Sequence, residues 1–323
     1  MTLFVLLGPT AVGKTALSLQ LAERLGAPIL NCDSRQIYRQ IPICTAAPTE
    51  AETRRVPHHF VATHSLSETY SAAQYEADVM QLLSPYFESD ASFVLSGGSM
   101  MYIDAVCRGI DDMPQADPAI RAQLRALYES EGLAPLLSQL QQLDPAYYAS
   151  VDRQNPQRVI HGLEMCLTTG RPFSSFRTGA RKPRPFRIVK IGLRRDRDEL
   201  YRRIDQRVDE MFAQGLADET RRVYDEYQAT VDAQFASVIR NPGPTQAQPI
   251  PNLMPSALNT VGLKEMLLHY TGIYSLEQAR ERICHNSHIY SKKQMTWFQR
   301  DADITWFHPD EQEEILKRIG RME

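Results

Sequence analysis

The sequence predicts an α/β fold, built as a P-loop-containing doubly wound parallel sheet with a helical insertion domain. Three observations lead to this prediction. Apolar runs of strand length at residues 3–7, 28–32 and 92–95 alternate with segments of helical spacing. The first and third runs each lead into a glycine-containing turn followed by a helical segment. Between residues 111 and 185 the alternation gives way to successive stretches with helical spacing, which indicates an insertion.

The composition is that of a globular protein long enough for two domains. Of the 323 residues, 43% are hydrophobic and 23% are charged, and the formal net charge is −3. Because this charge gives no global attraction to nucleic acid or membrane, an anionic partner must be held by a local basic patch. The first residues lack the features of a signal peptide, and no apolar stretch reaches membrane-spanning length. We therefore expect a cytoplasmic protein with no membrane partner.

The first glycine turn, GPTAVGKT at residues 8–15, matches the phosphate-binding pattern G-x-x-x-x-G-K-[ST] between a strand and a helix. Backbone N–H groups of such a loop surround a polyphosphate, the lysine adds positive charge, and the hydroxyl of Thr15 can ligate Mg²⁺. The residues expected to bind phosphate are Gly8, Thr10, Ala11, Val12, Gly13, Lys14 and Thr15. The same pattern is known as a nucleotide-binding and ATP-binding motif. It therefore predicts a ligand with a diphosphate or triphosphate group but does not identify that ligand.

Asp33 directly follows the second predicted strand. Ligands bind at the carboxyl ends of strands in open parallel sheets, so we expect Asp33 beside the phosphate loop. The alternative is that Asp33 caps the next helix, as aspartates at strand-to-helix turns commonly do.

Histidines and cysteines do not suggest a metal centre. His58 and His59 fall in an irregular stretch with several prolines and are interpreted as part of a loop, because adjacent histidines point in different directions. The five cysteines are far apart and form no C-x-x-C pair, so neither a disulfide framework nor a structural zinc site is predicted.

The predicted insertion contains helices over residues 119–131, 133–143 and 156–168. It closes with a stretch without acidic residues, in which arginines and a lysine alternate with phenylalanines. The members of this stretch are Arg171, Phe173, Phe176, Arg177, Arg181, Lys182, Arg184, Phe186 and Arg187. Such a combination suits phosphate neutralisation and base stacking, although a solvated loop is an equal alternative.

After a strand at 186–193, residues 195–227 form a highly charged helical region. Charges at i,i+4 spacing there, including Arg207, are interpreted as a solvated helix face and not as a site. A last helical region covers 275–300.

Several motifs behind the phosphate loop resemble those of the tRNA dimethylallyltransferases, also called tRNA isopentenyltransferases. These motifs are DSRQIY (33–38), YSAA (70–73), GGSMMY (97–102), NPQRV (155–159), NTVG (259–262) and KKQMTWF (292–298). The resemblance implies transfer of a dimethylallyl group from dimethylallyl diphosphate to N6 of the adenosine 3′ of the tRNA anticodon, with Mg²⁺ and release of pyrophosphate. Asp33 would then be the base that removes the N6 proton, and Ser99, where the family usually has Thr, would orient the reacting groups.

The resemblance also implies how the chain is divided and how it meets RNA. Residues 1–113 and 186–323 would form the catalytic core, and 114–185 would grip the tRNA anticodon stem-loop. We expect a monomer. The positions where the family contacts tRNA are Asp33, Ser34, Arg35, Gln36, Ser99, Arg121, Gln157, Arg158, Val159, Ile160, His161 and Lys264.

The chain departs from the family pattern at several cationic or polar positions, where it has Ala47, His161, Leu263 and Lys293. His161 replaces an arginine, which removes a permanent charge and a bidentate fork for phosphate. Three alternatives stay open, and the departures support only the last of them. They are a P-loop kinase for a nucleotide or metabolite, a prenyltransferase for free adenine nucleotides, and a paralogue that binds tRNA without modifying it.

Overall fold

The structure is a computed structural model that describes residues 1–114, 116–240 and 257–319. It divides into two compact units. The core unit consists of Met1–Cys107 and Arg184–Glu323, and the insertion unit consists of Arg108–Pro183. The expected insertion, residues 114–185, begins and ends a few residues later than this unit, so the connecting segments were assigned differently.

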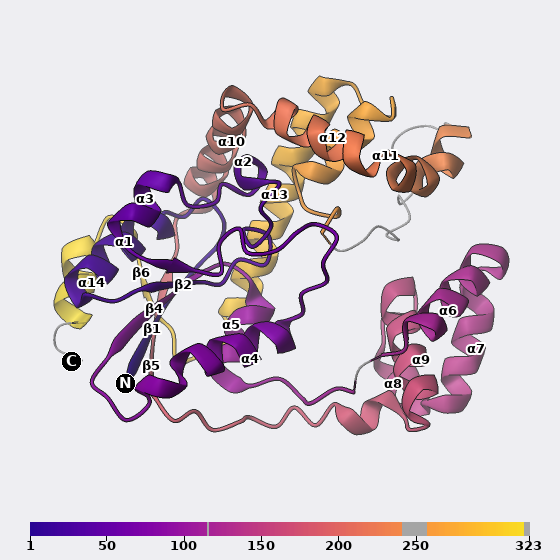
Figure 1. Cartoon of the computed structure of the whole chain (residues 1–323), viewed down its shortest axis with the longest axis horizontal. Helices are drawn as coiled ribbons and strands as arrows, with labels where there is room; N and C mark the ends of the chain where they lie inside the picture. The colour runs from indigo at the N-terminus through magenta and orange to yellow at the C-terminus, as the bar shows by residue number, and fades with distance from the viewer. Residues whose placement is uncertain (115, 241–256, 320–323) are drawn as a thin grey trace. The chain divides into compact units, whose positions relative to one another are not determined.

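The core unit is built on a six-stranded sheet with the order β3-β2-β4-β1-β5-β6, in which every pair of neighbours is parallel. Figure 1 shows the strands at the centre of this unit. The strands are β1 (Thr2–Leu7), β2 (Ile29–Asn31), β3 (His58–His59), β4 (Ser92–Gly97), β5 (Arg187–Leu193) and β6 (Thr305–Phe307). The predicted parallel α/β sheet is thus confirmed.

Two short edge strands were not predicted. His58 and His59, interpreted as a loop, form β3 and pair with Ile29 and Leu30 of β2. Thr305–Phe307 forms β6 beside β5. Strands of two or three residues carry too little alternation to be recognised in a sequence, so only the neighbouring strand reveals them.

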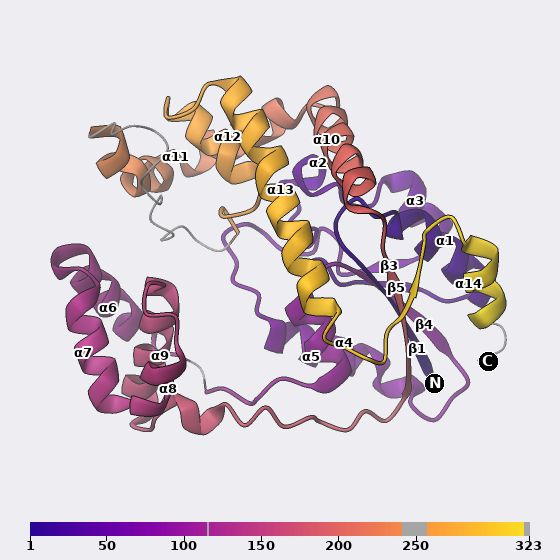
Figure 2. The same cartoon turned by 180° about the vertical axis from the view of Figure 1, so that it is seen from behind.

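The core unit's helices follow the predicted alternation and add several short elements. They are α1 (Lys14–Leu25), α2 (Pro42–Thr45), α3 (Glu50–Arg55), α4 (Ala72–Leu83), α5 (Met100–Arg108, which ends one residue beyond the division), α10 (Arg197–Ala213), α11 (Leu216–Arg240), α12 (Leu263–Tyr270), α13 (Leu276–Phe298) and α14 (Gln312–Ile319), with the 3₁₀ turn η1 (Ser84–Tyr86). The single helical region expected at 195–227 is therefore two helices, α10 and α11. Figure 2 shows α13 running from α12 toward α5.

Helices cover both faces of the sheet, as a doubly wound fold requires. Successive side chains of β1 point to opposite faces. Phe4 and Leu6 join a buried cluster with residues of α1, α10 and α14. Leu3, Val5 and Leu7 join a second cluster with residues of α4, α5 and the end of α13. All five side chains are at most 1% exposed, so the strand is buried on both sides.

The insertion unit is helical, as the periodicity predicts. It contains α6 (Pro118–Glu131), α7 (Leu133–Leu143), α8 (Pro145–Ser150), α9 (Pro156–Thr169) and the 3₁₀ turn η2 (Phe173–Phe176). These elements enclose a core of their own. Within the described part of the chain, none of the helices combines the length and the apolar character needed to cross a membrane.

Candidate active site

Three turns meet at the carboxyl edge of the sheet. The strands β2, β4 and β1 are neighbours, with Asn31 paired to Ser96 and Leu7 paired to Gly97. Because these parallel strands end at the same level, the chain leaves them at one edge of the sheet. The phosphate loop (residues 8–15), the Asp33 turn (33–36) and the Gly98–Ser99 turn therefore start side by side.

At Gly8 the phosphate loop packs closely against the end of β5. Gly8 has φ of +154°, and a Cβ atom there would lie 2.6 Å from the carbonyl oxygen of Leu193. The ammonium group of Lys14 donates to the carbonyl oxygens of Gly8, at 3.0 Å, and Pro9, at 2.8 Å. Although part of Lys14 remains exposed, desolvation by the surrounding protein and the nearby positive charge of Arg207 together lower the pKa of its ammonium to about 8.

Three arginines of the segment after β5 donate hydrogen bonds to the phosphate loop. Arg195 Nε donates to Val12 O at 3.0 Å, and Arg203 Nε donates to Ala11 O at 2.9 Å. Arg207 Nη1 donates to Thr10 Oγ1 at 3.0 Å. In a trans peptide the carbonyl and the following N–H point in opposite directions. The carbonyls of Ala11 and Val12, held by Arg203 and Arg195, therefore turn the N–H groups that follow them away from these two arginines.

Asp33 combines a structural contact with an accessible carboxylate. Its Oδ1 accepts hydrogen bonds from the N–H groups of Arg35, at 2.8 Å, and Gln36, at 3.4 Å. The alternative capping role is thus partly present, although residues 34–37 form a turn and not a helix. Among the described residues no partner holds Oδ2, so one carboxylate oxygen stays available.

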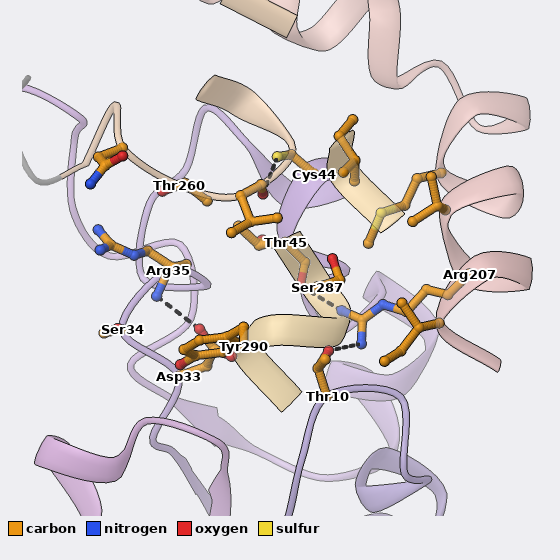
Figure 3. Close-up of a pocket in the computed structure, with 16 residues that line it drawn as sticks. Thr10, Asp33, Ser34, Arg35, Cys44, Thr45, Arg207, Thr260, Ser287 and Tyr290 are labelled. Atoms are coloured by element: carbon orange, nitrogen blue, oxygen red, sulfur yellow. Dashed lines mark hydrogen bonds between the residues drawn. The ribbon is translucent and has the colours of Figure 1, made fainter. Parts of the chain in front are cut away.

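Asp33 and Arg207 face one cavity of about 240 Å³, shown in Figure 3. Thr10, Thr45 and Tyr290 are among the other residues that line it. Burial raises the pKa of the Tyr290 hydroxyl, and the Asp33 charge adds to this effect, so the phenol is protonated at neutral pH. The cavity thus combines a carboxylate, a guanidinium and a hydroxyl donor.

Arg207 is a correction to the sequence analysis, which placed it on a solvated helix face. Besides Thr10, it contacts Thr45, whose carbonyl accepts from Nη2 at 3.1 Å. Its Nε is buried without a partner among the described residues. Desolvation lowers the pKa of the guanidinium, opposed by the charge of Asp33, but a guanidinium remains protonated in proteins. The sequence does contain a hint of this location. Arg207 lies between two apolar residues of the same helix, Ile204 and Val208, and both are buried in the structure.

Of the predicted phosphate-binding residues only Thr10 lines the cavity, and Lys14, Thr15 and Ser99 are absent from its lining. Ser99 is 7% exposed, and its N–H donates to the carbonyl of Cys32 at 3.1 Å, one residue before Asp33. Thr15 is exposed at the start of α1. Within the described residues, no group of three or more His, Cys, Asp or Glu side chains could hold a metal ion. An Mg²⁺ ion bound here would therefore depend on the Thr15 hydroxyl, phosphate oxygens and water, a donor set that suits this ion.

The remaining predicted RNA-binding residues of the core unit differ in their surroundings. Ser34 and Arg35 line the cavity. Gln36 is engaged within the protein, because its Nε2 donates to Thr45 O at 3.1 Å and Ala46 O at 2.9 Å. Lys264 is partly exposed on α12.

In the insertion unit, α9 presents some of the predicted residues and buries others. Arg158 and His161 are exposed and Gln157 is partly exposed, whereas Val159 and Ile160 are at most 3% exposed. The side chains of Val159 and Ile160 therefore pack into the core of the insertion unit.

Arg121 is held by a carboxylate of the same unit. Its Nε and Nη2 each donate to the carboxylate of Glu164 at 2.7 Å, and His161 Nδ1 lies 3.5 Å from the same group. Desolvation opposes ionisation of Glu164, but its hydrogen bonds with His161 and Arg121 prevail and lower its pKa. Arg121 and His161 are therefore fixed next to each other at the surface.

The basic and aromatic stretch does not form one continuous patch. The guanidinium of Arg171 stacks over Phe176 at 4.7 Å, and that of Arg177 over Tyr147 at 5.4 Å. The side chain of Arg184, in the core unit, is instead only 7% exposed and is paired with Glu76 at 2.6 Å. Arg184 is therefore a structural residue.

Comparison with known proteins gives a consistent result. The family model described as IPP transferase matches residues 36–301. A tRNA dimethylallyltransferase 2 of Parabacteroides distasonis is 50% identical over 320 residues, which cover 99% of this chain and 98% of that protein. A tRNA dimethylallyltransferase 2 of Porphyromonas gingivalis is 54% identical over 309 residues, covering 96% and 94% of the two chains.

Solved structures agree with the fold. The full-length tRNA isopentenylpyrophosphate transferase of Bacillus halodurans is 32% identical, with a TM-score of 0.66 and coverage of 99% of this chain and 95% of that one. A eukaryotic dimethylallyltransferase crystallised acting on tRNA is 23% identical, with a TM-score of 0.73 and coverage of 95% and 73%. At that identity the second likeness supports the fold alone.

Proposed function

The chain belongs to the IPP transferase family, and we propose that it is a tRNA dimethylallyltransferase. In the reaction, N6 of an adenosine attacks the allylic carbon of dimethylallyl diphosphate. A bond forms between N6 and this carbon, the bond from the carbon to the diphosphate oxygen breaks, and N6 loses a proton. The observation that carries this proposal is that Asp33 and Arg207 face the same cavity beside the phosphate loop.

The phosphate loop and Arg207 would hold the diphosphate. Lys14 and Arg207 supply two positive charges, and the Nε of Arg207 is a buried donor that needs an acceptor. Binding to these groups stabilises the negative charge that develops on departing pyrophosphate. Thr15 would hold Mg²⁺, which adds further positive charge next to the leaving group when it is bound.

Asp33 would accept the proton from the exocyclic amine. This amine is a weak nucleophile because its lone pair is delocalised into the ring, so proton removal must accompany attack. The turn holds Oδ1 through two N–H groups, which fixes the carboxylate while leaving Oδ2 for the substrate. The Ser99 hydroxyl would orient the diphosphate or the amine from the adjacent turn.

We propose the adenosine 3′ of the anticodon as the target and the exposed side chains of the insertion unit as contacts for the anticodon stem-loop. Single-stranded loops are the usual place for base-specific RNA recognition, because their bases can be splayed out. Arg158 and His161 on α9 and the stacked arginines Arg171 and Arg177 offer charge and aromatic surface. A monomer acting on tRNA in the cytoplasm is part of the same proposal.

The decisive experiment incubates the protein with dimethylallyl diphosphate, Mg²⁺ and unmodified tRNA, followed by digestion to nucleosides. We expect N6-dimethylallyladenosine and an equal amount of pyrophosphate. Parallel reactions contain ATP or free adenine nucleotides. Release of ADP from ATP, without prenyl transfer, would identify a kinase. Binding of tRNA without any prenylated nucleoside would identify a non-enzymatic paralogue, and prenylation of free adenine nucleotides in preference to tRNA would identify the third alternative.

A further inference from the structure

Gln294 on α13 connects the phosphate loop to the Gly98–Ser99 turn. Its Oε1 accepts a hydrogen bond from the N–H of Thr10 at 2.9 Å, and its Nε2 donates to the carbonyl oxygen of Gly98 at 2.8 Å. The residue is 2% exposed. Both polar ends of one buried amide are therefore used to join two turns that come from different strands.

The surroundings leave this amide little freedom. A Cβ atom on Gly98 would lie 2.4 Å from Gln294 Nε2, so only a glycine allows this approach. On the next turn of α13, Trp297 Nε1 donates to Asp104 Oδ2 at 2.8 Å, and Asp104 belongs to α5, which follows Ser99. The helix is thus fixed to the element that carries the Ser99 turn while its glutamine holds the phosphate loop.

These contacts continue on both sides of the glutamine. Thr10, whose N–H binds Gln294, accepts a hydrogen bond from Arg207 through its hydroxyl. Ser99, directly after Gly98, donates its N–H to the carbonyl of Cys32, which precedes Asp33. A chain of hydrogen bonds and single peptide steps therefore runs from the guanidinium at the phosphate loop, through Gln294, to the carboxylate.

We propose that Gln294 is a positioning residue that sets the distance between the bound diphosphate and the Ser99–Asp33 side of the cavity. This inference rests on the proposed function, in which the two sides hold the two reactants. Displacing reactants by about 1 Å costs on the order of 10² in rate. Loss of the bridge should therefore reduce kcat more than the affinity for diphosphate.

The test uses the Gln294→Glu and Gln294→Leu variants. A protonated glutamic acid has one O–H donor and one carbonyl acceptor, as the amide does, whereas a carboxylate has no donor for Gly98 O. For Gln294→Leu we expect kcat to fall about 10–100-fold at every pH. Gln294→Glu should show a similar loss of kcat at pH 8. Its kcat relative to that of the wild type should rise at least several-fold by pH 5.5. For both variants, the Kd of inorganic pyrophosphate, measured by calorimetry, should change less than kcat.

The matched control is Gln299→Glu, a change at an exposed position at the end of the same helix. The ratio of its kcat to that of the wild type should stay constant from pH 5.5 to pH 8. A Gln294→Leu variant with wild-type kcat, or a Gln294→Glu loss that does not respond to pH, would overturn the positioning role alone. A kcat loss matched by the loss of pyrophosphate affinity would also overturn it. A wild-type protein without prenyl transfer would overturn the proposed function and this inference together.

Discussion

Arg207 of α10 donates a hydrogen bond to the hydroxyl of Thr10 in the phosphate loop, with 3.0 Å between Nη1 and Oγ1. The same guanidinium donates to Thr45 O, while its Nε has no partner within the described residues. A planar group with several fixed donors can hold two protein oxygens and still offer an N–H to a ligand. Arg207 therefore belongs both to the wall of the cavity and to its expected anion site.

Replacing Arg207 by glutamine should weaken pyrophosphate binding about 10–100-fold, because a charge-assisted hydrogen bond contributes about 1.5–3 kcal/mol. Calorimetric titration of pyrophosphate in the presence of Mg²⁺ measures this effect. Arg202→Gln, on the exposed face of the same helix, is the control and should bind as the wild type does. Equal affinities for the Arg207 variant and the wild type would exclude Arg207 from the diphosphate site.

Asp33→Asn should abolish most of the prenyl transfer and leave pyrophosphate binding nearly intact. An amide can accept the turn's hydrogen bonds but cannot take a proton from the adenine amine, and general-base catalysis contributes on the order of 10²–10⁴ in rate. Single-turnover transfer of labelled dimethylallyl to an anticodon stem-loop measures the loss. A variant that keeps the wild-type rate would mean that another group is the base.

Diphosphate affinity should decrease as the pH rises through about 8, the value to which burial lowers the Lys14 pKa. Only the protonated ammonium attracts the ligand, and the bound diphosphate in turn favours the protonated form. Binding at pH 8–9 should therefore take up a proton, which appears in calorimetry as a dependence of the heat on the buffer. Lys14→Met serves as the reference, because subtracting its pH profile removes the ionisation of pyrophosphate itself. Identical profiles for the two proteins would contradict the assignment.

Glu219→Ala should destabilise the protein by about 2 kcal/mol or more, since it leaves two backbone donors without a partner. Glu219 of α11 is 2% exposed, and its carboxylate accepts the N–H groups of Ile43, at 2.8 Å, and Cys44, at 2.7 Å. Chemical denaturation measures the change. Glu226→Ala, at an exposed position of the same helix, should cost less than about 0.5 kcal/mol.

Glu219 should also give the stability a recognisable pH dependence. Burial raises the pKa of its carboxyl above the ordinary value of 4.5, so the native state binds the proton more tightly than the unfolded state does. The resulting stabilisation is complete below 4.5 and is lost as the pH rises through the native pKa. Denaturation at several pH values gives the slope of the unfolding free energy against pH, and Glu219→Gln should lack the part of this slope that Glu219 causes. The same slope in both proteins would assign it to other groups.

His161→Arg should strengthen binding of an anticodon stem-loop, because it restores the permanent charge that the family pattern has at this exposed position of α9. One added phosphate contact should steepen the dependence of log Kobs on log salt concentration by about 0.7–0.9. Fluorescence anisotropy over a salt series measures this slope. Unchanged affinity and slope would place position 161 outside the RNA interface.

Much of the fold was predictable because it depends on local patterns. Runs such as residues 3–7 and 92–95 are buried on both faces and read as continuous apolar strands, and the glycine turns after them mark the carboxyl edge of the sheet. The helices of the insertion unit show their spacing directly, and α7 (Leu133–Leu143) was predicted without error. The two-residue strand β3 and the three-residue strand β6 were missed, because pairing and not periodicity creates them.

The sequence by itself determined the parallel α/β core, the phosphate loop, the helical insertion and the placement of Asp33 after β2. Each of these follows from residues that are close together in the chain. Only the tertiary structure decided that Arg207 faces the cavity, that Gln294 bridges two turns, and that Val159 and Ile160 are buried. Gln294 lies 284 residues from Thr10, and a charged residue on a helix looks the same in sequence whether it faces water or a loop. Those roles depend on which elements pack together, and packing is a property of the folded chain.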